Sequence, residues 1–314
     1  MDPKDPEVGT APIHFIQPGG GFCFSLEIAW GKFRRAILNS FFPAHTGKMR
    51  ALRLGSCPEC THNIIDSRDL KLFSNVCGFY FDPDLDPFAG RNKIWFARPG
   101  IMELLCFTLL LVPATIAFIF MALQFHAAFG VGAVAGFLLW LFVISFFRNP
   151  PREIPVAPNI LVSPADGVIT NLEEVEETGI GKAFRVSIFL SVFNVHVNRV
   201  PLAGTVTHVR YYPGAFLDAR SSDCAKRNEQ LWIDLIEKEK GFPFRVKQIA
   251  GAIARRIVCQ VGVGKFLRRG ELYGMIKFGS RTDVLIPANL VEEVLVKVGS
   301  AVYGGSTIIL KLKD

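Results

Sequence analysis

The chain has 314 residues, half of them apolar, and its 35 Lys and Arg exceed its 28 Asp and Glu to give a formal charge of +7. This length and composition predict about two domains with a sizeable core and exclude disorder of the whole chain. The positive charge favours an anionic partner, either nucleic acid or a phospholipid surface.

Residues 1–99 are predicted to form an N-terminal extension. Within it, the stretch Phe22–Phe42 carries an apolar helical stripe, with its basic residues elsewhere. This pattern is typical of an amphipathic helix in a membrane interface and equally of a surface helix packed on the protein. The stripe consists of Leu26, Trp30, Phe33, Ile37 and Phe41.

Three cysteines further along the extension are the candidate metal ligands of this sequence. Cys57 and Cys60 are spaced like the paired thiolates of a zinc-ribbon knuckle, and Cys77 follows them. A fourth ligand is missing, because His62 follows Cys60 too closely. We therefore predict no metal site, and we interpret the segment as either a degenerate zinc-ribbon-like element or a purely structural one.

Two uncharged apolar runs, Leu104–Leu123 and Ala127–Phe147, come next. Each has about the 20 residues that a helix needs to cross a bilayer, and only a short turn separates them. We predict a transmembrane helical hairpin over residues 100–147, in which Gly132 and Gly136 allow the helices to approach closely. The alternative is a pair of buried helices in a soluble protein. The hairpin makes a membrane the expected partner and argues against nucleic acid.

Basic residues flank the predicted hairpin on both sides, whereas its connecting turn has no Lys or Arg. The positive-inside rule therefore places both ends, and the rest of the protein, on the cytoplasmic side of the cell (inner) membrane. The flanking residues are Arg91, Lys93, Arg98, Arg148 and Arg152.

After a proline-rich linker at 148–159, residues 160–314 change to short β-prone runs separated by turns. One helix is predicted, at Cys224–Lys240. The fold class is therefore mostly β (α+β), with a compact antiparallel β sandwich or barrel. The predicted strands are Ile160–Ser163, Gly167–Leu172, Phe184–Ser191, Thr205–Tyr212, Ile257–Val263, Tyr273–Phe278, Thr282–Ile286, Val294–Val298 and Ser306–Leu312.

The sequence Gly304-Gly305-Ser306 lies nine residues from the C-terminus, counting from the serine. Two glycines allow the backbone to adopt positive φ, which would let the serine hydroxyl reach the carbonyl of Gly305. Such a geometry permits an acyl shift from nitrogen to oxygen. Taken alone, the motif is explained equally well by a hairpin turn between two strands.

Together with that turn, four blocks make the stretch from about Phe146 to Lys313 resemble the phosphatidylserine decarboxylase proenzymes. Their Asn-Val-His-Val-Asn-Arg form resembles the short bacterial and archaeal branch, here with an N-terminal extension. The blocks are Phe147–Pro150, Ser163–Gly167, Phe189–Pro201 and Phe278–Asp283 leading to Gly304–Thr307.

The resemblance implies autocatalytic cleavage between Gly305 and Ser306, which converts Ser306 into a covalent pyruvoyl group. The chains 1–305 and 306–314 would then stay together. It further implies that Asp166 acts with a histidine to assist the attack of Ser306 during self-cleavage, and that His196 transfers protons near the pyruvoyl group. The longer bacterial members have a second histidine where this chain has Arg199. This leaves open whether His196 serves both steps.

The implied reaction is decarboxylation of phosphatidylserine to phosphatidylethanolamine through a Schiff base with the pyruvoyl group, without pyridoxal phosphate. Arg199 and Arg281 are candidates for binding the head group, unless they hold structural carboxylates, and Phe193 is a candidate for contacting the lipid. Homo-oligomers are left open. One alternative is an archaetidylserine-type decarboxylase. Another, from a different class, is an unprocessed, membrane-anchored biotinyl- or lipoyl-like carrier module, although this sequence lacks the hairpin that presents a modified lysine in such modules.

Overall fold

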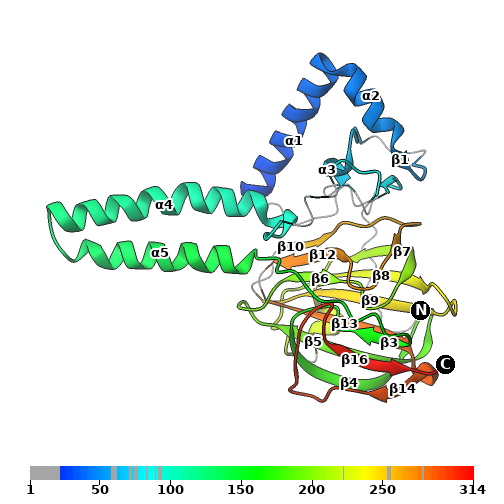
Figure 1. Ribbon diagram of the computed structural model, residues 1–314. Helices are drawn as coiled ribbons and strands as arrows, with labels where there is room; N and C mark the ends of the chain where they lie inside the picture. The colour runs from blue at the N-terminus through cyan, green and yellow to red at the C-terminus, as the bar shows by residue number, and fades with distance from the viewer. Residues whose placement is uncertain are drawn as a thin grey trace.

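The computed structural model describes the chain from Phe22 to Asp314 except residues 58–61, 71–72, 74–76, 83, 89, 91–93, 222, 253–255 and 278. Three parts are evident in Figure 1: an N-terminal group of short elements, a long helical hairpin and a β domain. Cys60, Arg91 and Lys93 lie outside the described residues. The N-terminal elements are α1 (Phe22–Phe41), α2 (Pro43–Ala51), β1 (Arg53–Leu54), α3 (Ser67–Leu70) and β2 (Tyr80–Phe81).

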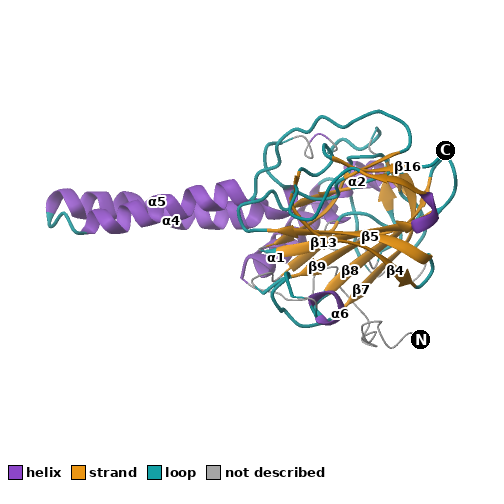
Figure 2. Cartoon of the chain, turned by 90° about the horizontal axis from the view of Figure 1, so that it is seen from below, coloured by secondary structure: helices purple, strands orange, loops and turns teal. Residues whose placement is uncertain are grey.

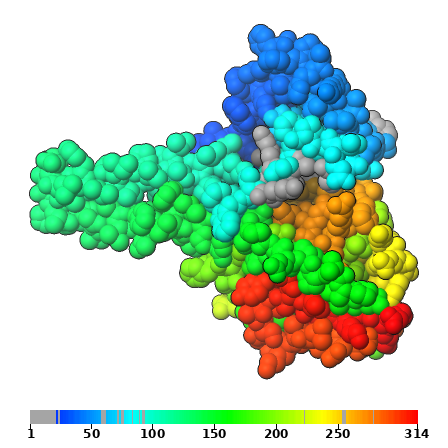
Figure 3. Space-filling model, in the orientation of Figure 1, coloured from blue at the N-terminus to red at the C-terminus, as the bar shows by residue number. Residues whose placement is uncertain are grey.

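A short 3-10 turn, η2 (Arg98–Gly100), leads into the hairpin of α4 (Ile101–Gln124) and α5 (Phe129–Phe146). Both helices are long and apolar enough to cross a membrane. A Cβ atom added at Gly132 would lie 2.8 Å from the Phe118 ring, and one at Gly136 would lie 2.6 Å from the hydroxyl of Thr115. The two glycines therefore allow the close approach that the sequence predicted. Figures 2 and 3 show the hairpin projecting as a rod from the rest of the molecule.

The β domain confirms the predicted mostly β, antiparallel architecture. A curled eight-stranded sheet has the order β11-β7-β8-β9-β13-β5-β4-β15, and two three-stranded sheets, β10-β12-β6 and β14-β16-β3, pack on it. The strands are β3 (Ile160–Val162), β4 (Gly167–Glu177), β5 (Gly181–Leu190), β6 (Val197–Arg199), β7 (Gly204–Tyr212), β8 (Gln230–Glu237), β9 (Pro243–Ala250), β10 (Arg256–Cys259), β11 (Phe266–Leu267), β12 (Leu272–Lys277), β13 (Ser280–Pro287), β14 (Val291–Val294), β15 (Ala301–Val302) and β16 (Ile308–Leu312).

The apolar core of the β domain lies between the large sheet and the two small ones. Alternate residues of the central strands point into it, as period-two burial requires. Val284 and Ile286 of β13 and Val186 and Ile188 of β5 are examples. Opposite them, Leu310 of β16 closes the core from the small sheet.

The predicted helix Cys224–Lys240 is wrong. Only Cys224–Arg227 is helical, as α6, and Gln230–Glu237 forms strand β8 between β7 and β9. Charged residues with good helix propensity suggested a helix, but Leu231, Ile233 and Leu235 alternate into the core. Tertiary packing therefore decides the conformation here.

One predicted strand is displaced, and five strands of the β domain were not predicted. The run Val294–Val298 is mostly irregular, because β14 ends at Val294 and a turn follows at Gly299, whose φ is +90°. The 3-10 turn η3 (Ala288–Leu290) precedes β14. The sequence did not indicate β6, β8, β9, β11 or β15, most of which are short or carry charged residues.

Buried ion pairs join the hairpin to the β domain. Glu103, in the first turn of α4, accepts from Lys277 and lies 3.2 Å from the guanidinium of Arg256. Arg256 in turn contacts Glu27 of α1 at 3.0 Å. Two cations and two carboxylates thus balance in a site from which water is largely excluded, and such a site tolerates the loss of a single partner poorly.

We predict that Glu103→Ala destabilises the protein by about 3 kcal/mol, because it leaves two buried cations with one carboxylate. The midpoint of thermal unfolding in detergent solution would fall. A double variant, Glu103→Ala with Lys277→Met, removes one charge of each sign and should recover most of that loss. An unchanged midpoint for the single variant would contradict the role assigned to this network.

Candidate active site

A tight turn at residues 303–306 joins β15 to β16. The N–H groups of Ser306 and Thr307 both donate to the carbonyl of Tyr303, at 3.1 and 3.0 Å. Gly305 has a φ of +82°, a conformation that side chains other than glycine rarely adopt. The positive φ that the sequence suggested for the glycine pair therefore occurs at Gly305.

The segment Ser163–Asp166 holds this turn through backbone hydrogen bonds. The N–H of Gly305 donates to the carbonyl of Ser163 at 2.8 Å, and the N–H of Ser163 donates to the carbonyl of Thr307 at 2.8 Å. On either side, β3 pairs with β16 and β4 pairs with β15. The two turns are thus fixed against each other by the strands that enter and leave them.

Asp166 places a carboxylate at the turn. Its Oδ1 accepts from the N–H of Gly304 at 2.8 Å, and its Oδ2 accepts from Arg152 at 2.6 Å. Burial raises the pKa of Asp166 above the ordinary value for an aspartate, and these two donors act in the opposite direction. The site therefore holds a carboxyl group that is a stronger base than an exposed aspartate.

Arg199, the last residue of β6, lies next to Gly305. A Cβ atom at Gly305 would come within 2.9 Å of Cδ of Arg199 and of Cδ1 of Ile154. The guanidinium donates to the carbonyl of Gly270 at 3.0 Å and to Oδ1 of Asn149 at 2.9 Å. Burial lowers the pKa of Arg199 to about 10, helped by the charge of Arg152, so the group stays positive at neutral pH.

His196 directly precedes β6, at the end of the strand opposite to Arg199. Its ring packs on Phe146 at the end of α5, with a centroid distance of 4.3 Å. Nδ1 lies 2.9 Å from the carbonyl of Asn194, and Nε2 accepts from the N–H of Gly279 at 3.3 Å. These bonds assign the proton to Nδ1. Burial lowers the pKa of His196 to about 4, so the ring is neutral at pH 7.

The remaining sequence candidates lie elsewhere. Phe193 is 73% exposed and makes an edge contact with Phe142 of α5, at the base of the hairpin. Arg281 is buried in the large sheet, where its guanidinium donates to Asp283 at 2.6 Å and to Ser187 at 2.7 Å. That pairing favours the structural alternative for Arg281 over binding of a head group.

Sequence reasoning missed Arg152, Ile154 and Asn149, which it assigned to a linker or to an unspecified block. All three contact Asp166, Arg199 or the position of Gly305. Asn149 could have been found from its place in the Phe147–Pro150 block, which carries part of the family resemblance, whereas no signal in the sequence marks Arg152 or Ile154.

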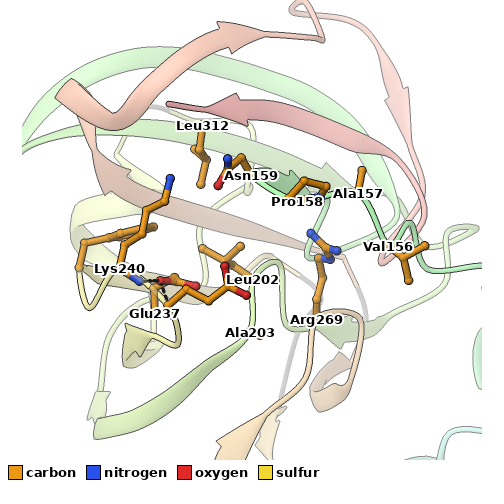
Figure 4. A pocket seen from close by; sticks show the side chains of 12 residues that line it. Val156, Ala157, Pro158, Asn159, Leu202, Ala203, Glu237, Lys240, Arg269 and Leu312 are labelled. Atoms are coloured by element: carbon orange, nitrogen blue, oxygen red, sulfur yellow. Dashed lines mark hydrogen bonds between the residues drawn. The ribbon is translucent and has the colours of Figure 1, made fainter. Parts of the chain in front are cut away.

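For metal, the described part of the chain has no cluster of three or more histidine, cysteine or acidic side chains placed to hold an ion. Cys57 is partly buried and Cys77 is buried. A cavity of about 230 Å³ (Figure 4) is lined by residues such as Asn159, Arg269 and Leu312. It lies at the far end of β16 from Ser306, so it does not belong to this site.

Comparison with known proteins decides the family. The family model described as phosphatidylserine decarboxylase matches residues 139–310, which is more than half of the chain. The chain belongs to the phosphatidylserine decarboxylase family. The resemblance expected from the sequence is therefore confirmed, and the match includes Asp166, His196, Arg199 and the turn at Ser306.

Individual relatives in the family are named phosphatidylserine decarboxylase proenzyme. That of Rhodopirellula baltica is 42% identical over 247 residues, which are 78% of this chain and all of the relative. Those of Carboxydothermus hydrogenoformans and Wolbachia pipientis wMel are 49% and 45% identical, over 56% and 63% of this chain and 83% and 86% of their own lengths. The term proenzyme implies that these relatives are processed.

The geometry predicts that Gly305→Ala destabilises the protein more than Gly299→Ala. Both glycines have positive φ, +82° and +90°, so each substitution costs about 1–2 kcal/mol of backbone strain. Only at Gly305 would the new Cβ also meet other atoms, because nothing lies within 4 Å at Gly299. Thermal unfolding of the two variants measures the difference. Equal midpoints would show that the side chains of Arg199 and Ile154 move aside at little cost, and would contradict the prediction.

Proposed function

We propose that this chain is a phosphatidylserine decarboxylase that cleaves itself between Gly305 and Ser306 and carries a pyruvoyl group derived from Ser306. The observation that carries the proposal is the buried carboxylate of Asp166, hydrogen-bonded to Gly304 in the turn that ends at Ser306. A hairpin turn of purely structural use does not need a desolvated carboxylate and two arginines beside it.

In the proposed maturation, Oγ of Ser306 attacks the carbonyl carbon of Gly305, and Asp166 takes up the hydroxyl proton. The peptide nitrogen takes up that proton and leaves as the amine of residue 306, so an ester replaces the amide. Loss of the α proton of Ser306 then breaks the Cβ–Oγ bond, which frees the carboxylate of Gly305 and leaves dehydroalanine. Addition of water and release of ammonia give the ketone. The positive charges of Arg152 and Arg199 favour the negative charge that develops at Gly305.

The surroundings of Ser306 fit a pyruvoyl group at this position. Residues 306–314 would remain bound after cleavage, because β16 is the central strand of its sheet and buries Ile309 and Leu310. When formed, the pyruvoyl group supplies an electron-withdrawing ketone that takes up the electron pair released as carbon dioxide leaves. We propose that Arg199, whose side chain lies beside Gly305, holds the anionic part of a substrate there. Proton transfer by His196 stays a prediction.

The hairpin would bring the enzyme to its substrate. We place α4 and α5 across the membrane, with both ends and the β domain on the cytoplasmic side, because Arg98, Arg148 and Arg152 flank the hairpin and its turn has no basic residue. Exposed Phe193, next to α5, then lies at the level of the lipid head groups.

Substitution of the serine tests the proposal directly. The purified protein should yield a nine-residue fragment, 306–314, whose N-terminus is blocked by pyruvate, and should release carbon dioxide from phosphatidylserine. Ser306→Ala should remain full length, with activity at background. Ser300→Ala, in the preceding turn, is the matched control and should process normally. A Ser306→Ala chain that still splits, or still decarboxylates the lipid, would refute the assignment.

A second test addresses Asp166. Asp166→Asn keeps an acceptor for the N–H of Gly304 but removes the base, so processing should slow by about 10²–10⁴-fold. In the unsubstituted protein, processing should also slow as the pH falls through the raised pKa of Asp166. Arg152→Gln removes a charge that lowers that pKa, so its pH profile should move to higher pH. Time courses on gels measure the processing rates of the unsubstituted protein and of the two variants. Identical rates for the unsubstituted protein and Asp166→Asn would exclude Asp166 as the base.

A further inference from the structure

Helix α1 is oriented with its apolar stripe away from the protein. Leu26, Trp30 and Phe33 are 38%, 57% and 58% exposed, whereas Glu27 and Arg35 on the opposite side are buried. A surface helix of a soluble protein has the reverse arrangement. The polar face of α1 is used for contacts with the protein, and its apolar face remains for another partner.

A group of buried charges beneath α1 has more cations than anions. Asp66 contacts Arg34 at 3.2 Å and Arg68 at 2.6 Å, and Asp69 contacts Arg34 at 2.6 Å and Arg35 at 2.9 Å. Each aspartate is thus shared by two arginines. Both aspartates are almost completely buried, and the arginine side chains are no more than 20% exposed. Excess positive charge at so dry a site favours an additional anion.

Among the residues that the structure describes, the neighbouring charges named here do not remove this excess. Glu27 is committed to Arg256 in the balanced network at the base of α4. Arg98, which precedes α4, adds a further positive charge, and its guanidinium donates to the carbonyl of Ser67 at 3.1 Å. Among the described residues named here, three arginines pair with the two aspartates, and Arg98 lines the same cavity as Arg34 and Arg68.

A cavity of about 520 Å³, here called the basal cavity, opens where α1, α3 and α4 meet. Its volume is within the range of ligand pockets. One side carries three arginines together with the carboxylates of Glu27 and Asp69, which are themselves paired with arginines. The other side is apolar and continues along the exposed surface of α4. The lining used in the argument consists of Trp30, Arg34, Arg68, Arg98, Met102 and Leu105.

The direction of α1 matches a membrane surface. In Figure 1, α1 leaves the base of the hairpin at a steep angle to α4, and in Figure 2 it is seen nearly end-on beside that base. If the hairpin crosses the bilayer, α1 runs along the bilayer surface. The basal cavity then lies at the depth where phosphate groups meet acyl chains, and Trp30 lies at the level that tryptophan prefers.

We infer that α1 lies in the membrane interface and that the basal cavity binds an acidic phospholipid, separate from the catalytic turn. The phosphate group would contact Arg34, Arg68 and Arg98, and the acyl chains would lie along Met102 and Leu105 of α4. This inference rests on the proposed membrane hairpin but not on the pyruvoyl chemistry. The binding tethers the N-terminal extension and holds the β domain close to the membrane surface.

The test measures lipid retained by the purified full chain. The detergent-solubilised protein is offered phosphatidylglycerol or phosphatidylcholine, and bound lipid is counted by native mass spectrometry. We expect preferential retention of phosphatidylglycerol, which falls about 30-fold in Arg34→Gln with Arg98→Gln. Each aspartate keeps one arginine in this variant, so the fold should survive. The matched control, Arg210→Gln with Arg220→Gln, loses the same charge from the β domain and should retain the lipid.

A second variant keeps all charges and fills the cavity. Met102→Trp should also reduce retention of phosphatidylglycerol. Inorganic phosphate is added in a parallel sample; complete displacement of the lipid by millimolar phosphate would show a site for a free anion and overturn the inference. Equal retention by the unsubstituted protein and both cavity variants would overturn it as well.

Two further readouts separate this inference from the proposed function. Resistance to alkaline extraction from membranes reports on the hairpin, and release of the 306–314 fragment reports on self-cleavage. Both should be the same in the cavity variants and in the unsubstituted protein. A chain that is extracted by alkali would end the membrane proposal. A chain that stays inserted and processes, but retains both lipids equally, would end only the lipid site.

Discussion

The hydrogen bonds between Ser163–Asp166 and the turn at 303–306 are the constraint on which the candidate site depends. They join segments that are 138 residues apart, as the bond between Asp166 and Gly304 illustrates. Because β3 pairs with β16 and β4 with β15, a shift in either register would move the carboxylate away from the turn. The same pairing holds residues 308–312 without any need for the 305–306 peptide bond. A fold that retains its last strand by sheet bonding can lose a backbone link and keep its shape.

The charges at the base of the hairpin divide into two groups with different consequences. Glu27, Glu103, Arg256 and Lys277 balance one another, so this network fixes the hairpin to the β domain without attracting a further ion. The group around Asp66 and Asp69 is also built from buried carboxylates and basic side chains but contains more arginines than aspartates. Burial makes this imbalance costly, whereas at an exposed surface counterions would screen it. The difference between the two groups is therefore in stoichiometry rather than composition.

The sequence predicted those features that depend on local pattern. The hairpin helices follow from uninterrupted apolar runs, and most strands follow from alternating or β-branched residues. The flexible position at Gly305 follows from the glycine pair. Features that depend on contacts between distant segments were not predictable in this way. The stretch 224–240 has helix-forming residues, yet β7 and β9 on either side make Gln230–Glu237 a strand. Nothing local to Arg152 indicates that it pairs with Asp166, because two prolines precede it, Pro155 follows closely, and no periodicity applies.

The two ends of β6 separate two chemical environments. Arg199 ends the strand beside Gly305, whereas His196 precedes it, about 10 Å away along the backbone at 3.3 Å per residue. Both ring nitrogens of His196 are engaged by the backbone of Asn194 and Gly279, and its face packs on Phe146 at the end of α5. One imidazole held in this way cannot also act at the turn unless the Gly279 bond opens. We therefore propose a division of roles, in which Asp166, with Arg152 and Arg199 beside it, acts on the 305–306 bond. His196 would act at the end of the domain that contacts α5.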